Sequence, residues 1–256
     1  MKSPDSLLLG ELTSDSVSEV VENEDFDIIL PLGACEQHGP HLPLSTDQII
    51  AEAIAKEVAE SVGNALVAPS IPVGVSGHHI LFCGTATTGL EVYVPFLKDI
   101  VTSLLSHNFR SVYIITGHAG NSASMSSVVD HFESESVIAF SDWPAQRSII
   151  HKVASEELGM DPEIVGTHAG HFETSIMLLL RPDLVNESRY ERGFVGTPEK
   201  ASSILMSAGM KSLSEIGVIG DPANSSKVAG RLYLNALVGH VTQGIEAHRN
   251  RRVSQV

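Results

Sequence analysis

The hydrophobic pattern alternates between short apolar runs and longer amphipathic stretches. Apolar runs of strand length cover residues 27–33, 65–74, 111–120 and 137–140. Apolar residues recur at helical spacing over residues 49–62, 90–109 and 122–131. An uninterrupted apolar run is typical of a strand covered on both faces, and repeated strand–helix units predict a mostly parallel sheet with helices on both sides. We therefore expect an α/β fold.

Helical periodicity dominates the second half of the chain. The pattern predicts helices over residues 145–158 and 227–248, and residues 166–180 form a polar loop that enters an apolar helix. No repeat, low-complexity tract or linker divides the sequence. One domain over residues 1–256 is the simplest prediction.

Composition and charge narrow the functional classes. The 256 residues are 43% hydrophobic, enough for a full core, and the formal charge of -15 would repel a nucleic-acid backbone. No apolar run has the length of a membrane span, and the first residues lack the apolar core of a signal peptide. Cys35 and Cys83 form neither a CxxC pair nor a disulfide framework. We expect a soluble cytoplasmic protein without nucleic-acid or membrane partners.

The loop after the first predicted strand carries the densest group of ionisable side chains. In ACEQHGPHLPLSTD, Glu36 and His38 are two residues apart, so on extended backbone both project to the same side. Asp47 lies near the start of the next helix and can return to the same point. Carboxylate and imidazole together suit Zn(II), Mn(II) or Fe(II), and an aspartate using both oxygens can bridge two ions.

Two later loops offer further ligands. His118 follows the apolar run over 111–120, so it should emerge at the same edge of the sheet. Glu173 lies in the first turn of a helix if that helix begins near Gly170, and the helix dipole favours an anion there. Capping or a salt bridge is the competing interpretation for Glu173. The predicted metal ligands are Glu36, His38, Asp47, His118 and Glu173.

Neighbouring polar residues receive weaker assignments. His41 lies between two prolines and is given no role, and His78 and His79 either line a pocket or are exposed. Cys35 is interpreted as a small buried residue, because no His or Asn arrangement that would activate a nucleophile is visible around it.

Three motifs together resemble those of a known family. EQHGPHLPLSTD (36–47), TGHAGN (116–121) and HAGHFETS (168–175), in this order and spacing, resemble the creatininase family of metal-dependent amidohydrolases. The similarity extends from GELT at residues 10–13 to GVIGDP at 217–222 and the closing helix. HAGHFETS and GVIGDP look closer to the branch of the mycofactocin precursor peptide peptidase than to creatininase proper.

The resemblance implies a three-layer αβα sandwich, two divalent metal ions per chain and a homo-oligomer, often a hexamer built from dimers. By position, Glu36 and His118 would hold one metal, His38 the other, and Asp47 would bridge them. Family members use a metal-activated water, mostly on amide-like carbonyls.

Two departures bear on the substrate. Creatininase proper carries a glutamate ligand where this chain has Gly120, and a catalytic glutamate where it has Thr167. The tryptophan expected just before the second glutamate is replaced by Ile164. Glu173 could supply the missing ligand, but strict creatinine hydrolysis is disfavoured.

These observations predict an amidohydrolase that cleaves a C–N bond of a small cyclic amide, a formamide or a short peptide. His168 is the candidate for proton transfer to the leaving nitrogen, since an ordinary histidine pKa of about 6.5 suits that task, and Glu173 is the second catalytic candidate. Ser76, Ala119 and His168 are expected to line the substrate pocket. The alternatives are a mycofactocin-type peptidase specifically, creatinine amidohydrolase proper, a single-metal hydrolase and a non-catalytic small-molecule or peptide binder.

Overall fold

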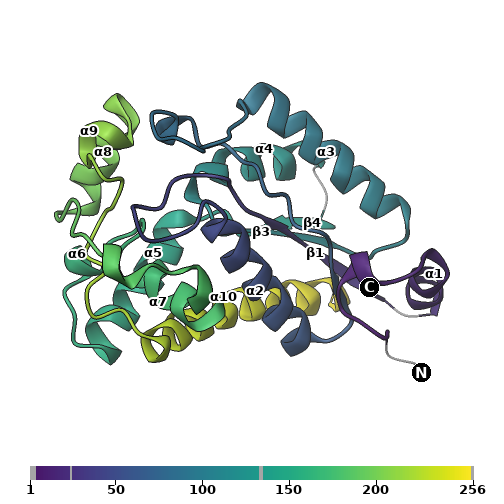
Figure 1. Ribbon diagram of the computed structural model, residues 1–256. Coiled ribbons are helices and arrows are strands. Elements are labelled where there is room, and N and C mark those ends of the chain that lie inside the picture. Colours follow the sequence, from purple (N-terminus) through teal and green to yellow (C-terminus); the bar gives the residue numbers. More distant parts are fainter. Residues whose placement is uncertain (1–3, 24, 133–134, 255–256) are drawn as a thin grey trace.

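The computed structural model describes residues 4–23, 25–132 and 135–254, and its centre is a four-stranded parallel sheet (Figure 1). The strand order is β2-β1-β3-β4, with every neighbouring pair parallel. The strands are β1 (Asp27–Leu32), β2 (Ala65–Val67), β3 (Val112–Thr116) and β4 (Val137–Ala139). Ile28 of β1 pairs with Val112 of β3, and Leu32 pairs with Thr116, so these two strands end at the same level.

Helices cover both faces of the sheet. One core contains residues of α2 (Thr46–Val62), α5 (Trp143–Lys152), α7 (His171–Leu180) and α10 (Lys227–Val253). The other contains residues of α1 (Ser14–Asn23), α3 (Leu90–Ser106) and α4 (Ser122–Phe132). The helices α6 (Pro162–Val165), α8 (Pro198–Ala208) and α9 (Met210–Leu213) lie at one end of the molecule, and Val165 of α6 joins the first core (Figure 1). The expected three-layer αβα sandwich is confirmed.

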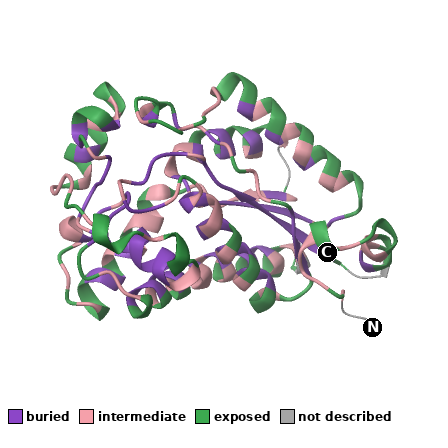
Figure 2. Cartoon of the chain, viewed as in Figure 1, coloured by how far each residue is buried: buried purple, intermediate pink, exposed green. Residues whose placement is uncertain are grey.

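Strand side chains alternate between the two cores. Ile29 of β1 joins the core with α2 and α10, whereas its neighbours Ile28 and Leu30 join the core with α3 and α4. All six residues of β1 are buried, and the strands lie inside the molecule in Figure 2. An apolar run without polar alternation is what a strand covered on both faces requires.

Several predicted elements end earlier than expected. The strand predicted over 65–74 stops at Val67, and beyond it Ile71 and Gly74 make isolated bridges, to Leu32 and Thr87. Pro69 and Pro72 lie in this segment and lack the N–H that a sheet ladder needs. The helix predicted over 145–158 is α5 followed by a π-helical turn at Val153–Glu157.

Short 3-10 turns complete the secondary structure. They span Leu9–Glu11, Gly77–His79, Ala119–Asn121, Pro182–Leu184 and Glu187–Arg189. Within the described ranges, no helix combines the length and apolar character needed to cross a bilayer.

The strand order creates a crevice beside the carboxyl end of β1. From β1 the chain crosses to β2 on one side and later returns to β3 on the other. Ligand sites in parallel α/β sheets lie outside the strand ends at such a switch point. The loops after β1 and β3 are those that carry the histidine motifs.

Candidate metal centre

The structure brings the five predicted ligands into one buried cluster. Glu36 and His38 follow β1, His118 follows β3, and Asp47 and Glu173 lie in the first turns of α2 and α7. All five are buried, with exposures from 0% to 5%. Glycine makes this convergence possible: a Cβ on Gly117 would lie 2.2 Å from the carbonyl oxygen of Asp47. Only a residue without a side chain lets the loop after β3 approach α2 so closely.

One side of the cluster is formed by His38, Asp47 and Glu173. His38 Nε2 lies 3.0 Å from Asp47 Oδ1 and 3.7 Å from Glu173 Oε2. The Glu173 carboxylate is held by the preceding loop, because Ala169 N–H donates to its Oε2 at 2.6 Å. The helix containing Glu173 begins at His171, as expected, which places its side chain at the positive end of α7.

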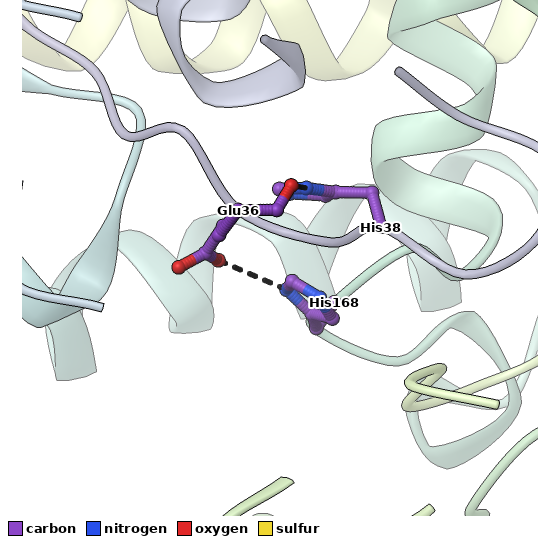
Figure 3. A group of neighbouring side chains, drawn as sticks. All are labelled: Glu36, His38 and His168. Atoms are coloured by element: carbon purple, nitrogen blue, oxygen red, sulfur yellow. Dashed lines mark hydrogen bonds and ion pairs between the residues drawn. The ribbon is translucent and has the colours of Figure 1, made fainter. Parts of the chain in front are cut away.

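The other side is centred on Glu36. Its Oε1 lies 3.3 Å from His118 Nδ1 and 3.6 Å from His168 Nδ1, the second contact being visible in Figure 3. His79 Nε2 approaches the same oxygen at 3.6 Å. His118 Nδ1 also lies 3.3 Å from Asp47 Oδ2, so the two oxygens of Asp47 face opposite sides of the cluster.

Three carboxylate oxygens in the cluster have no hydrogen-bond partner among the described residues. They are Glu36 Oε1, Glu36 Oε2 and Asp47 Oδ2. A buried, unpaired carboxylate is costly unless a cation or a donor satisfies it. Three groups have ligand atoms within 4.8 Å of one another: Glu36, His38 and His168; Glu36, His78 and His118; His38, Asp47 and Glu173. The donor set therefore fits divalent metal ions.

The pKa values of two histidines in the cluster are shifted in opposite directions. Burial lowers the pKa of His38, but the charges of Asp47 and Glu173 outweigh it and raise that pKa to about 10. For His168, burial and the charges of His38 and His79 hold the pKa well below its usual value. Burial also raises the pKa of Glu173 to about 7. His168 is thus held as a neutral imidazole, with a pKa below the ordinary value that the sequence-based argument assumed.

The predicted pocket residues occupy different places. Ala119 and His168 line a cavity of about 80 Å³ over the cluster, together with His78, His79 and Trp143. Ser76 is fully buried behind His118, and its Oγ lies 3.3 Å from His118 Nε2. Ser76 is absent from the cavity wall, so its position favours orienting His118 over the predicted substrate contact.

Sequence reasoning missed two residues of the site. Gln37 contacts both His79 and His168, and Trp143 at the start of α5 lines the cavity. For His78 and His79 the sequence allows either a pocket or an exposed loop; the structure places both in the cavity wall, with His79 2% exposed and His78 half-buried. No spacing rule places His78 and His79 at the cluster, because their loop reaches it only through the tertiary fold.

A family model described as creatinine amidohydrolase matches residues 10–245. The chain belongs to the creatininase family. It is therefore an amidohydrolase, an enzyme that acts on C–N bonds. Creatininase-fold crystal structures share the architecture: "Creatininase Mn" superposes with a TM-score of 0.79 at 27% identity, covering 95% of this chain and 98% of that one.

Curated relatives carry two kinds of name. The mycofactocin precursor peptide peptidase of Mycobacterium tuberculosis H37Rv is 34% identical over 241 residues, covering 90% of this chain and 88% of its own. The creatinine amidohydrolase of Pseudomonas putida is 32% identical over 203 residues, covering 72% and 75%. Creatininase-family chains with different substrates in their names therefore share this fold.

The structure explains how the chain does without a side chain at position 120. A Cβ on Gly120 would lie 2.3 Å from His118 Nε2 and 2.4 Å from the carbonyl oxygen of Val75. No carboxylate fits there unless His118 moves. Glu173 reaches the cluster from α7 instead, and Thr167 lines the cavity without a charge.

Substitution Gly120→Ala is expected to displace His118 and to lower the free energy of unfolding by about 1–3 kcal/mol, the usual cost of overpacking. Urea unfolding and metal content per chain measure the two effects. Gly239→Ala in α10 is the matched control, since nothing lies within 4 Å of its added Cβ and alanine favours a helix. Equal stability and metal content in the two variants would contradict the close packing at Gly120.

Proposed function

We propose that the chain is a dinuclear-metal amidohydrolase that cleaves an amide C–N bond in a short peptide or another small amide. The observation that carries this is the position of Asp47. Its Oδ1 faces the group of His38 and Glu173, and its Oδ2 faces the group of Glu36 and His118. A carboxylate placed between two such groups is the arrangement that a bridging ligand requires.

Each proposed ion takes ligands from two loops. Glu36 and His118 would hold one ion, His38 and Glu173 the other, with Asp47 between them. Bound ions would act as Lewis acids and lower the pKa of water from about 15.7 towards ~7. The chain's contribution is to bring these ligands together in a buried site, where charge interactions are stronger than in water.

His168 is the proposed proton carrier. Its Nε2 is 2.9 Å from the backbone oxygen of Gln37, while Nδ1 faces Glu36 across 3.6 Å. A neutral imidazole in this position can take a proton at Nδ1 and return it to the leaving nitrogen. No base at position 167 is needed for that step.

The size of the cavity and the relatives guide the choice of substrate. The cavity of about 80 Å³ is small, and its wall includes the apolar Leu205, Met210 and Ile219. Four relatives at 31% to 34% identity are named mycofactocin precursor peptide peptidase. A short peptide is therefore the first substrate class to test, with formamides and cyclic amides after it.

The direct test is turnover by protein reconstituted with Zn(II) or Mn(II). We expect amine release, detected by mass spectrometry, from members of a short-peptide panel and little release from creatinine. Activity should rise up to two equivalents of metal per chain. Saturation at one equivalent would favour the single-metal hydrolase, and binding without turnover across peptides, formamides and cyclic amides would favour the non-catalytic binder.

Three further properties stay predictions from the sequence. They are the single domain, the cytoplasmic location and the homo-oligomer, whose size light scattering can measure.

A further inference from the structure

Gln37 lies between two proposed ligands in the chain but points its side chain away from the metal cluster. It is 5% exposed. Its amide oxygen Oε1 accepts a hydrogen bond from Gly39 N–H at 2.9 Å, and its amide nitrogen donates to the carbonyl oxygen of Gly217 at 3.2 Å. The same nitrogen lies 2.8 Å from Nδ1 of His79 and 3.0 Å from Nε2 of His168.

The two backbone contacts fix the orientation of the amide. Gly39 N–H can only donate and the Gly217 carbonyl can only accept. Rotating the amide by half a turn would place NH₂ against an N–H and oxygen against a carbonyl. Both contacts would then be repulsive and buried, and buried polar groups without a partner are costly. The NH₂ group must therefore face His79.

The fixed NH₂ group determines where His79 carries its hydrogen. An amide nitrogen only donates, so His79 Nδ1 must accept, and the hydrogen of a neutral ring lies on Nε2. That nitrogen faces Glu36 Oε1 at 3.6 Å. The positive end of the N–H dipole is thus directed at a buried carboxylate that has no hydrogen-bond partner among the described residues.

The backbone of Gln37 fixes the tautomer of His168, and it does so as an acceptor rather than as a donor. Its carbonyl oxygen lies 2.9 Å from His168 Nε2, and a carbonyl can only accept, so Nε2 carries the hydrogen. The 3.0 Å approach of the Gln37 amide to Nε2 is then a contact between two donors, because its hydrogens are used by His79 and Gly217. His168 Nδ1 is left with a free lone pair facing Glu36.

We infer that Gln37 is a positioning residue that sets the tautomers of both histidines, so that His79 presents N–H to Glu36 while His168 presents a lone pair to the site. The consequence for catalysis rests on the proposed function, since it gives His168 the unprotonated Nδ1 that a proton carrier needs. The hydrogen positions themselves do not depend on it. A hydrogen bond to the far nitrogen of an imidazole is the usual means of fixing such a tautomer.

Neutron diffraction from deuterium-exchanged crystals of the full-length, zinc-loaded protein near pH 8 tests the inference directly. Deuterium is expected on His79 Nε2 and on His168 Nε2, with none on either Nδ1. Deuterium on His79 Nδ1 or on His168 Nδ1 would overturn it. Because this readout needs no substrate, correct tautomers in an inactive protein would refute only the proposed function, and reversed tautomers in an active one only the inference.

A variant distinguishes control of tautomers from simple packing. Gln37→Glu keeps the acceptor for Gly39 N–H but offers His79 a carboxylate oxygen, so deuterium should move to His79 Nδ1. His168 should be unchanged, because it bonds to the backbone. An unchanged His79 beside an introduced carboxylate that carries no deuterium would contradict the role assigned to the Gln37 side chain.

Metal affinity provides a second readout. Gln37→Met, close in size but without the amide, should weaken zinc binding by up to about 10-fold in competition with a chelator, because His79 is no longer held with its N–H toward Glu36. Gln243→Met on the exposed face of α10 is the matched control and should bind zinc as the unmodified chain does. Equal affinity in both variants would overturn the inference that Gln37, through His79, directs an N–H toward Glu36.

Discussion

Replacement of Asp47 by asparagine is expected to remove metal from both positions of the centre and to lower turnover by at least ~10³-fold. The aspartate is 1% exposed, with Oδ1 3.0 Å from His38 Nε2 and Oδ2 3.3 Å from His118 Nδ1. Asparagine keeps the shape but has one oxygen and no charge, so it cannot serve two cations. Metal ions supply several kcal/mol of transition-state stabilisation, and each 1.36 kcal/mol is tenfold in rate.

Elemental analysis and initial rates on the same preparation check this prediction. Asp99→Asn on the exposed face of α3 is the matched control and should keep full metal and activity. If Asp47→Asn retained two ions and normal turnover, the bridging role would be wrong. Retention of one tightly bound ion with activity would point to a mononuclear enzyme.

Replacement of His168 by alanine should lower kcat by about 10²- to 10⁴-fold while the metal content stays unchanged. This is the range expected when a general acid or base is lost. His168 is 8% exposed and is not among the five proposed ligands, although its Nδ1 lies 3.6 Å from Glu36 Oε1. Measuring both rate and metal content therefore shows whether His168 Nδ1 carries a proton or binds metal.

Alanine also leaves a gap, because the His168 ring centroid lies 4.3 Å from that of His38 and 4.5 Å from that of His79. His168→Gln fills much of that space and can donate to the Gln37 carbonyl, yet it cannot carry a proton. It should be as slow as the alanine variant. Loss of metal in both variants would make His168 a ligand, and full activity in either would remove it from proton transfer. His131→Ala on the exposed end of α4 is the control.

The fold was predictable where the sequence pattern had one physical interpretation. The apolar run at residues 27–33 contains β1 because only a strand covered on both faces needs no polar alternation. The run at 65–74 was misleading beyond Val67, since apolar composition cannot show that the chain has left the sheet. Helices α8 and α9 were not predicted.

In the site, the sequence predicted the metal ligands but not the residues that hold them in place. Four ligands could be recognised by their side-chain chemistry and by their position after predicted strands: Glu36, His38, Asp47 and His118. Gln37 carries no such signal, because a neutral amide between two ligands could equally face solvent. Ala169 is a further case: it adopts a φ of +51°, a conformation that favours glycine, and its N–H holds Glu173 in place. Such strain becomes visible only with the backbone in view.

The wide spacing of the ligands along the chain has a consequence for folding. Glu36 and Glu173 are separated by more than half of the 256 residues, and β3 with His118 lies between them. The centre therefore cannot assemble until the sheet and α7 are in place, unlike a zinc finger, whose neighbouring cysteines and histidines bind metal while the chain is still short. Metal should enter a largely formed protein and then act as a cross-link between distant segments. Its contribution to stability should grow with the logarithm of the free metal concentration.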